Sequence, residues 1–291
     1  MQNRTWTDRI GDSINYALLF IISLCAVLPF VYVLAGSFTA SEELLGNRLV
    51  LFPTKYSLDG YRYIFSSSVI GQSLAVTVFI TVAGTLTNLL FTCLMAFGLA
   101  HKDLAGRKVI MFLVVFTLLF SGGIIPTYLI VKSFGLINTF GALIIPGAIS
   151  AFNLIILKNF FQQLPDGLEE AAEIDGCNYL QIMFRIVIPL SLPAIATFAL
   201  FYAVGHWNQF FSALLYINDS NKWPIQIWLR QIVILASGGI GDSSQFGETF
   251  VPPAQTVKMA TIVIATVPIL MVYPFLQKHF AKGVLLGSVK E

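Results

Sequence analysis

Charge is what this chain of 291 residues has least of. Asp, Glu, Lys and Arg make up only 11% of it, whereas a soluble domain has roughly 25%. The formal net charge of +2 gives no reason to expect a nucleic-acid partner. Only three cysteines occur, two in apolar segments and one in a charged loop (Cys25, Cys93 and Cys177), so no disulfide framework is predicted. These absences exclude an ordinary soluble domain and a disulfide-rich secreted one.

Signatures of common enzymes are also missing. The sequence has no G-x-x-x-x-G-K-[ST] phosphate loop, so we do not expect the chain itself to bind and hydrolyse ATP by that route. Its three histidines are far apart, with no H-E-x-x-H pair and no Cys/His ligand spacing, and no G-x-S-x-G element occurs. We therefore expect no catalytic residue, no metal site and no bound cofactor in this chain.

Hydrophobic residues, in contrast, make up 56% of the sequence. A membrane-spanning helix needs about 20 mostly apolar residues to cross the hydrocarbon core. Six stretches meet or approach this length: residues 14–38, 69–100, 109–131, 141–157, 186–217 and 257–276. The first is too long for the apolar part of a secretory signal and is interpreted as a retained helix. The pattern predicts an all-α polytopic membrane protein with six transmembrane helices.

The distribution of Lys and Arg predicts the orientation. Basic residues are concentrated in short connections such as 101–108, which the positive-inside rule assigns to the cytoplasm, together with both termini and residues 158–185. We expect one membrane domain, in which residues 1–68 form the first helix and an outer loop and residues 69–280 form a five-helix core. The outer connections 39–68 and 218–256 are long enough for short helices, and the glycines and prolines of 238–253 indicate irregular structure.

The connection at about 158–185 has the features of two capped helices. Asp166 can cap a helix that begins near Gly167, with Glu169 reaching back in a capping box. Gly176 can adopt the left-handed conformation that ends a helix. Asn178 can cap a second short helix through about residue 185, with a proline a little beyond it where the chain turns into the fifth apolar stretch. By itself, this pattern also fits an ordinary pair of capped surface helices.

The full spacing is more specific. Glu170-Ala171-Ala172, Gly176 and Ile186-Val187-Ile188-Pro189 follow the pattern E-A-A-x3-G-x9-I-x-I-P. This pattern resembles the cytoplasmic coupling loop of the permease subunits of bacterial ATP-binding-cassette (ABC) importers, although Ile188 stands where that family usually has Leu. The resemblance implies that the loop contacts an ATPase. The residues it marks for coupling are Glu169, Glu170, Ala171, Ala172, Asp175, Gly176, Ile186 and Pro189.

Other segments extend the likeness over nearly the whole chain. Residues 164–200, 205–208 (Gly-His-Trp-Asn), 223–226 (Trp-Pro-Ile-Gln) and 250–260 resemble the carbohydrate-uptake class, particularly oligosaccharide permeases. The resemblance implies the type I ABC importer permease fold in the bacterial cytoplasmic membrane, surrounded by lipid. It also implies a second homologous permease, two ATPase subunits that hold ATP and Mg, an extracytoplasmic solute-binding protein and an oligosaccharide substrate carried by alternating access.

A cluster of amides and aromatics in the fifth stretch is the candidate substrate path. Amides can bond sugar hydroxyls, aromatic rings can stack on sugar faces, and polar groups in hydrocarbon need a partner. The same side chains also suit interhelical packing. The cluster comprises His206, Trp207, Asn208, Gln209 and Phe211, with Tyr128 and Asn153 as further candidates. Near Tyr128, Ser121-Gly122-Gly123 followed by Pro126 can break the third helix beside the path.

Two other functions remain open at this point. An ion-coupled secondary transporter commonly carries Asp, Glu or His inside the membrane. The first five stretches contain no Asp, Glu, Lys or Arg, which favours a pathway powered from outside the membrane domain. A membrane sensor or scaffold is the second alternative, and co-purification with an ATPase stimulated by a loaded binding protein would separate it from an importer.

Overall fold

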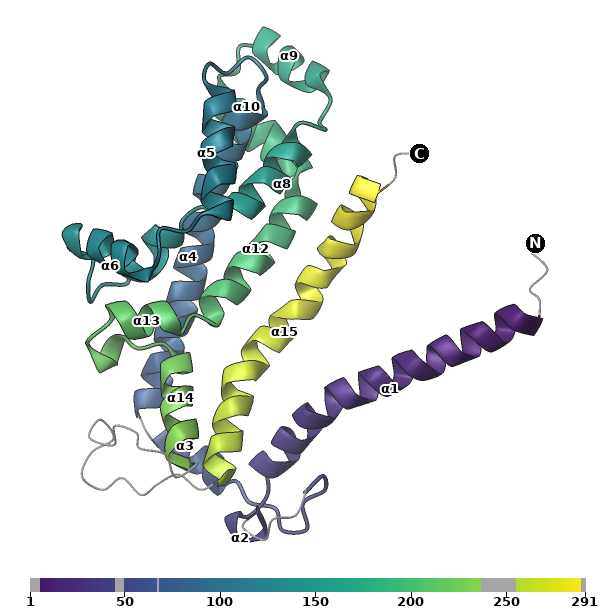
Figure 1. Ribbon diagram of the computed structural model, residues 1–291, viewed down its shortest axis with the longest axis vertical. Helices are drawn as coiled ribbons and strands as arrows, with labels where there is room; N and C mark the ends of the chain where they lie inside the picture. The colour runs from purple at the N-terminus through teal and green to yellow at the C-terminus, as the bar shows by residue number, and fades with distance from the viewer. Residues whose placement is uncertain (1–5, 45–49, 67, 237–254, 289–291) are drawn as a thin grey trace. The chain divides into compact units, whose positions relative to one another are not determined.

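A computed structural model describes residues 6–44, 50–66, 68–236 and 255–288 (Figure 1). The irregular segment predicted at 238–253 lies outside these residues. Within them the regular structure is helical, apart from one isolated bridge between Thr39 and Tyr56. The helices are α1 (Trp6–Ser37), α2 (Ser41–Leu44), α3 (Asp59–Ser66), α4 (Ser68–Ala100), α5 (Arg107–Leu119), α6 (Ile124–Ser133), α7 (Gly141–Ile144), η1 (Ile145–Gly147), α8 (Ala151–Phe161), α9 (Asp166–Ile174), α10 (Tyr179–Ile182), η2 (Met183–Val187), α11 (Ile188–Leu190), α12 (Leu192–Trp207), α13 (Phe211–Tyr216), η3 (Ser220–Lys222), α14 (Ile225–Ala236) and α15 (Gln255–Ser288).

The predicted all-α membrane fold is confirmed, and half of its spans are broken. In the described part of the chain, three helices are long and apolar enough to cross a membrane: α1, α4 and the first part of α15. Three bent pairs also pass the test of length and composition. They are α5 with α6 at 120°, α7 and η1 with α8 at 52°, and the segment from α10 to α11 with α12 at 85°. The count reaches the predicted six when each bent pair is one span.

The break in the third span lies where the sequence predicted it. Phe120 is extended at the end of α5, and Gly123 has φ 85° immediately before α6. A left-handed or mirror-region φ is accessible to glycine without a Cβ penalty, so the chain turns sharply here. Figure 1 shows α6 turned away from the axis of α5.

The fifth stretch, residues 186–217, was predicted as one apolar segment, and the structure divides it into several helices. The chain bends after α11 at Ser191, and α12 ends at Trp207 before the separate helix α13 begins at Phe211. Pro193, near the start of α12, has no N–H to donate to the preceding turn, which explains why a new helix starts there. Hydropathy alone does not detect these breaks because the residues around them are still mostly apolar.

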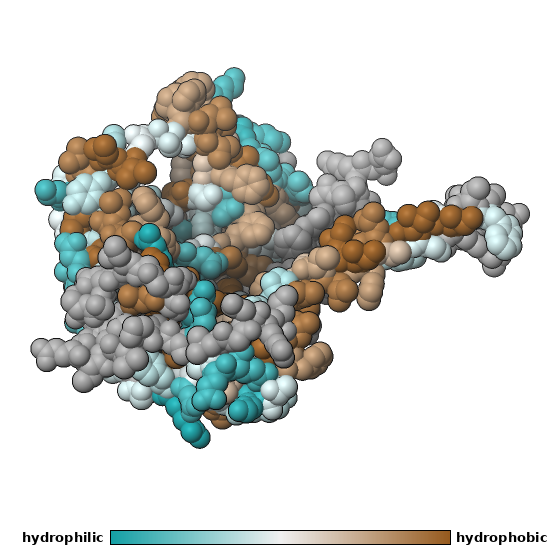
Figure 2. All heavy atoms as spheres, turned by 60° about the horizontal axis from the view of Figure 1, so that its bottom comes forward, coloured by the Kyte–Doolittle hydropathy of each residue, from teal (hydrophilic) through white to brown (hydrophobic). Residues whose placement is uncertain are grey.

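The chain divides into two compact units, Met1–Ile70 with Leu229–Thr266, and Gly71–Trp228 with Val267–Glu291. In the first unit, α1 and α15 approach closely at Gly36, where a Cβ would collide with the sulfur of Met259. Met259 packs with Leu44 and Val50. The remaining surface of α1 is apolar and exposed, as the brown side chains of this helix in Figure 2 show. Such a surface suits a helix surrounded by lipid.

The second unit contains the larger core. Side chains of α4, α5, α8, α9, α10, η2 and α12 pack together, and Ala96, Leu157 and Met183 are completely enclosed. α9 and α10 lie at one end of this unit, beyond the ends of α4, α5 and α8 (Figure 1). The core therefore holds in place the helices that contain the E-A-A spacing.

Candidate functional site

The first candidate site is the pair of helices α9 and α10, here called the knob. α9 begins at Asp166, one residue earlier than predicted, and its N-cap is Pro165, which makes no side-chain cap bond. The predicted capping box from Asp166 to Glu169 is therefore wrong, because Asp166 already lies inside the first helical turn. Asp166, Glu169 and Glu170 all lie in the first half of α9, where the positive end of the helix dipole favours acidic side chains.

The turn at Gly176 is as predicted. Gly176 has φ 81°, its N–H donates to the carbonyl of Glu173 at 3.0 Å, and the N–H of Cys177 donates to the carbonyl of Ala172 at 2.9 Å. These two bonds form a Schellman motif, which satisfies carbonyls left free at the end of a helix. Asp175 is the C-cap residue. The joint of the knob is therefore fixed by backbone geometry that favours glycine.

The start of the second helix is also as predicted, but its end is not. Asn178 accepts the N–H of Gln181 at 2.9 Å, and the Gln181 side chain accepts the N–H of Asn178 at 2.9 Å, a complete capping box. The helix does not end near residue 185. It continues through the π-helix η2 into α11, which contains Pro189. The wider π turn gives the proline ring room where a regular α turn would clash with the preceding carbonyl.

The coupling residues predicted from the sequence face different surroundings. Ala172 is only 6% exposed and packs into the core of the unit, whereas Ala171 and Glu170 are exposed. Ile186 is half-buried against the same core and Pro189 is exposed. Ile174 at the end of α9 is 86% exposed, and Leu180 in α10 is 58% exposed. The knob thus buries Ala172 in its own unit and leaves Ile174 and Leu180 largely exposed.

The end of α4 beneath the knob is capped by three other segments. His101 Nδ1 lies 2.9 Å from the carbonyl of Phe97, Arg107 Nε donates to the carbonyl of Leu99 at 2.9 Å, and Gln162 Nε2 donates to that of Ala100 at 2.9 Å. Free carbonyls at a helix end favour such donors, and the negative end of the helix dipole favours cations. Residues of the 101–108 connection and of α8 are therefore tied to one helix end.

A cavity of about 660 Å³ lies between this helix end and the knob. On one side it is lined by Phe97, His101, Lys102 and Asp103, and on the other by Glu169, Glu170, Glu173 and Tyr179. His101 Nε2 lies 3.1 Å from the Glu169 carboxylate, outside hydrogen-bond alignment, so their contact is electrostatic. Sequence reasoning missed His101, and its position beside Lys102 in a short basic connection was the available signal.

The second candidate site is a row of polar contacts between α4 and α12. A Cβ at Gly84 would lie 2.5 to 2.7 Å from the ring of His206, so these helices touch there. One turn further along α4, Asn88 Oδ1 lies 3.3 Å from His206 Nε2. After another turn, the Thr92 and Tyr202 hydroxyls lie 2.8 Å apart. The spacing of four residues places these α4 positions on one face of the helix.

The same side chains satisfy backbone groups at the break in the fourth span. Asn88 Nδ2 donates to the carbonyl of Gly147 at 2.9 Å, and Gln209 Nε2 donates to that of Leu143 at 3.0 Å. The Tyr202 hydroxyl accepts the N–H of Ser150 at 3.2 Å. Broken helices inside a membrane need such partners because lipid supplies none. Of the predicted cluster, Gln209 thus uses its amide donor in a contact between helices, as the packing alternative describes.

A cavity of about 480 Å³ borders this row, within the range of small-molecule sites. His206 and Gln209 line it, and Gln209 Oε1 is buried without a hydrogen-bond partner in the described part of the chain. The remaining lining includes Asn88, Thr127, Phe201, Tyr202, Ser212 and Tyr216. An unpaired amide oxygen beside hydroxyls and aromatic rings is suited to receive the hydroxyl of a sugar.

The other predicted path residues are not among those that line this cavity. Trp207 is buried, Phe211 is exposed, and the Asn208 side chain donates to the carbonyl of Val204 at 2.9 Å, where it caps α12. Asn153 is buried, and its N–H is capped by a serine at the start of α8. Tyr128 stacks on Tyr216, which does line the cavity, with ring centroids 6.2 Å apart.

Sequence reasoning missed Asn88 and Tyr202. Both lie in stretches that hydropathy marks simply as apolar, and only the spacing of Gly84, Asn88 and Thr92 at intervals of four indicated a shared face.

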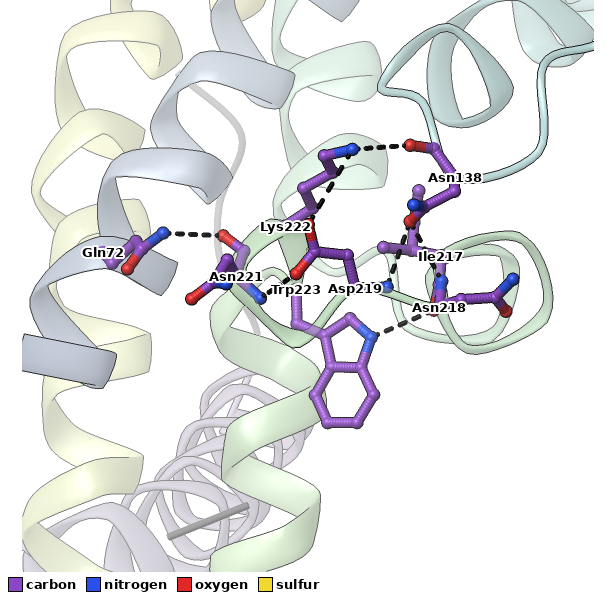
Figure 3. A network of polar contacts seen from close by, with 8 residues as sticks. All are labelled: Gln72, Asn138, Ile217, Asn218, Asp219, Asn221, Lys222 and Trp223. Carbon is purple, nitrogen blue, oxygen red and sulfur yellow. Dashed lines mark hydrogen bonds and ion pairs between the residues drawn. The ribbon is translucent and has the colours of Figure 1, made fainter. Parts of the chain in front are cut away.

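A third polar cluster, here called the loop network, ties the connections around α6, α13 and η3 together (Figure 3). Asn138 has φ 62°, and its Oδ1 accepts the N–H groups of Asn218 and Asp219 at 3.2 and 3.0 Å. Lys222 Nζ donates to the carbonyl of Asn138 at 2.9 Å. Gln72 Nε2 donates to the carbonyl of Asn221 at 3.0 Å, which links the network to α4.

Comparison with known proteins agrees with these features. The chain belongs to the family of binding-protein-dependent transport system inner membrane components, whose model matches residues 95–286. It is 60% identical over 283 residues to the polygalacturonan/rhamnogalacturonan transport system permease protein YtcP of Bacillus subtilis (strain 168), covering 97% of this chain and 99% of that protein. It is 54% identical to Protein LplC of the same organism over 290 residues, 99% of this chain and 97% of that one.

A solved structure supports the fold. A chain in the crystal structure of a bacterial ABC transporter involved in the import of the acidic polysaccharide alginate superposes with a TM-score of 0.88 and 32% identity, covering 96% of this chain and all of that one. The fold is thus that of an ABC importer permease. The protein is a multi-pass membrane component of sugar transport and not itself an enzyme.

Proposed function

We propose that this chain is a transmembrane subunit of an ATP-driven oligosaccharide importer and that the knob is the surface on which a separate ATPase docks. The observation that carries the proposal is the exposure of Ile174 and Leu180 on a capped helix pair that continues directly into a broken span. Apolar side chains exposed together outside the lipid-facing helices mark an interaction surface. A push on the knob is transmitted through η2 and α11 to α12, whose side chains line the smaller cavity.

The proposed assembly has the partners that the sequence implies. A second homologous permease faces this one, two ATPase subunits hold ATP and Mg, and an extracytoplasmic binding protein delivers the sugar, which crosses by alternating access. The family description names dependence on a binding protein. The knob and both termini then face the cytoplasm, as the positions of Lys and Arg predict.

The proposed substrate is an oligosaccharide that contains uronic acid. Two of the proteins named above belong to systems for polygalacturonan and rhamnogalacturonan or for alginate, polysaccharides that carry carboxylates. Only one titratable side chain other than tyrosine, His206, is found among the described residues lining the smaller cavity, so neutral donors and acceptors would make most contacts there. Gln209 is the central candidate because its oxygen is unpaired.

The coupling proposal is tested at Gly176. A Cβ there meets nothing within 4 Å, so the effect of substitution comes from the positive φ and not from a clash. Gly176→Val should strongly reduce uptake and ATPase stimulation by the loaded binding protein in the reconstituted complex, whereas Gly176→Asn, which tolerates this φ, should keep most of both. Unchanged uptake and stimulation in Gly176→Val, with the ATPase bound, would reduce the knob to a surface connection.

The substrate proposal is tested by uptake of galacturonate, alginate and neutral arabino-oligosaccharides in the same complex. Uronic-acid oligomers should be imported and should stimulate the ATPase, and neutral ones should not. Gln209→Met should reduce uptake by more than Asn208→Ala, since only Gln209 lines the cavity. Equal uptake by these two variants at equal membrane levels would remove the Gln209 amide from the path.

A further inference from the structure

The first turn of α5 carries charges that a helix start does not favour. The positive end of the helix dipole lies there and favours acidic side chains, which α9 has at its own start. α5 instead begins with Arg107 and Lys108, has no acidic residue in its first turn, and is preceded by an N-cap glycine that supplies no side-chain cap. Basic residues at this end of a helix are unfavourable unless an anion lies beside them.

Two backbone donors at the start of α5 also lack acceptors. The N–H groups of Arg107 and Ile110 donate to carbonyls of the preceding turn at 3.2 and 3.1 Å. Between them, those of Lys108 and Val109 have no acceptor among the described residues. Both residues are exposed. Free N–H groups at an exposed helix N-terminus are well placed to bind a phosphate or another anion.

A buried lysine lies at the same place. Lys158, near the end of α8, is only 9% exposed, and in the described part of the chain it has no hydrogen bond or ion pair. The charge of Arg107 acts on it, so its ammonium group lies near the start of α5. The Arg107 side chain is itself held by its bond to the carbonyl of Leu99. Because lysine is seldom buried to this extent without an anionic partner, Lys158 is an independent sign of an anion here.

The surface that continues from these cations is apolar. Phe112 and Phe116 follow Lys108 at intervals of four residues, so they share one face of α5, and Phe120 extends the row at the end of the helix. The ring centroids are 6.4 and 4.7 Å apart along the row, and all three rings are largely exposed. A soluble anion would leave this row bare, whereas a ligand with an anionic head and a long apolar tail covers it.

We propose that the start of α5 and Lys158 bind the phosphate of an anionic phospholipid, whose acyl chain lies along this row of phenyl rings. The two free N–H groups supply fixed donors, and Arg107, Lys108 and Lys158 balance the charge of the head group. The adjoining connection is predicted to face the cytoplasm, and basic pockets between helices on that side suit anionic head groups. The inference requires only a chain that lies in a membrane and does not depend on the sugar or the ATPase.

Two lysine variants test the site. Lys158→Met keeps the apolar stem of the buried side chain and removes its charge. Lys108→Gln removes an exposed charge from the same helix start, so it leaves the core intact. The matched control is Lys132→Met, at an exposed position in the last turn of α6. A lysine at that end of a helix already suits the dipole and requires no anion.

The full-length chain is titrated in mild detergent with dioleoyl-phosphatidylglycerol or dioleoyl-phosphatidylcholine, and native mass spectrometry measures the affinity for the first bound lipid. The wild type and Lys132→Met should prefer phosphatidylglycerol. Lys158→Met and Lys108→Gln should each weaken its binding by about fivefold, the contribution of one basic residue at an anionic membrane surface. Binding of phosphatidylcholine should change little. Circular dichroism checks that each variant keeps its helices.

Two further probes separate a lipid from a soluble anion. Glycerophosphoglycerol, the head group without acyl chains, should compete only at concentrations far above those at which the lipid binds. Phe116→Ala should weaken binding of the dioleoyl lipid and leave that of dihexanoyl-phosphatidylglycerol unchanged. The reason is that Phe116 lies about 12 Å along the helix from Lys108, beyond the reach of a six-carbon chain.

Three outcomes overturn the inference. Equal affinity of the wild type for the two dioleoyl lipids, or wild-type affinity for phosphatidylglycerol in either lysine variant, shows that no anionic head group is bound here. Competition by glycerophosphoglycerol at the concentration at which the lipid itself binds shows that the ligand is a soluble anion. Since neither uptake nor ATP hydrolysis is measured, these outcomes leave the proposed function untouched.

Discussion

The two ends of α4 are both tied to other segments, but by different chemistry. Near its start, Gln72 bonds a loop carbonyl, and Thr77 accepts the N–H of Ile225 at 2.8 Å. The Gln72 contact joins the loop network of Figure 3, in which an amide, a lysine and main-chain groups satisfy one another. At Ala100, side chains from the adjoining connection, α5 and α8 cap the carbonyls, and the nearby knob keeps apolar residues exposed.

The two ends of α4 differ in how far their polar groups are satisfied by neighbouring residues. The loop network uses its donors and acceptors within itself, so changes there should lower stability. The knob end leaves a cavity, a histidine in electrostatic contact and an exposed apolar surface, so changes there should reduce coupling more than stability. The middle of α4, where Gly84 meets His206 of α12, lies between these two ends.

The largest loss of stability is expected at Asn138. Asn138→Leu removes the acceptor of two backbone N–H groups and places a side chain without a local hydrogen bond at φ 62°. The free energy of unfolding should fall by about 2–4 kcal/mol, seen as a lower midpoint of thermal unfolding in detergent. Asn138→Asp keeps the acceptor and should lose much less. Equal midpoints for the two variants would contradict the role of the network.

A smaller loss is expected at the middle of α4. Gly84→Ala forces a Cβ against the His206 ring and should destabilise the protein by about 1–3 kcal/mol. Gly98→Ala on the same helix meets nothing within 4 Å and should be neutral or stabilising, because alanine is the better helix former. Comparing the midpoints of thermal unfolding of Gly84→Ala and Gly98→Ala separates the effect of the contact with His206 from the effect of helix propensity. Tolerance of alanine at Gly84 would show that α4 and α12 separate easily.

At the knob end, the effect on stability should be smaller still. Gln162→Leu removes one bond to the Ala100 carbonyl, worth about 0.5–1.5 kcal/mol. Uptake per ATP hydrolysed should fall more than the unfolding midpoint does, because this bond ties α8 to the helix end below the knob. A large drop in the midpoint with unchanged uptake per ATP would erase the distinction between the two ends.

The smallest effect concerns Glu43 in the first unit. The hydrogen bond from the backbone N–H of Lys55, followed by hydrogen bonds from Thr54, holds the pKa of this exposed carboxyl below its ordinary value. The carboxylate therefore stabilises the loop above the pKa of a free carboxyl, about 4, and this contribution is lost as pH falls through the lower folded-state pKa. The protection factor of the Lys55 amide, which compares its hydrogen exchange with that of an unstructured peptide at the same pH, should fall on acidification.

Glu43→Gln should remove that pH dependence. Glu42→Gln is the control, because Glu42 has only a 4.0 Å ion pair to Lys55. If the protection of the Lys55 amide depends on pH equally in Glu43→Gln and Glu42→Gln, Glu43 is not the group that protects this amide.

Local signals predicted some of these features well. Gly176 and Asn178 were found because a left-handed turn and a capping box are properties of a few adjacent residues. The break before α6 was found for the same reason, from Ser121-Gly122-Gly123 and Pro126. The cap was predicted at Asp166, and it lies one residue earlier, at Pro165.

The candidate sites were harder to predict because they depend on contacts distant in sequence. The end of α12 is stabilised in part by Gln209, whose partner is 66 positions away at Leu143. Asn88, Tyr202 and His101 likewise contact residues that are distant in the sequence. Their partners are Gly147, Thr92 and Glu169. Hydropathy found the membrane segments, but it does not show which polar group satisfies which broken backbone.

The π-helix η2 has a consequence for evolution by insertion and deletion. Its five residues bond one step wider than an α-helix, as in the Ile188 N–H to Met183 carbonyl bond, so the turn accommodates one additional residue. Since each residue advances an α-helix by about 100°, removing that residue would rotate the knob by roughly a quarter turn about the axis of α11. Ile174 would then point to a different side, and a length change of one residue would redirect the proposed docking surface without altering its composition.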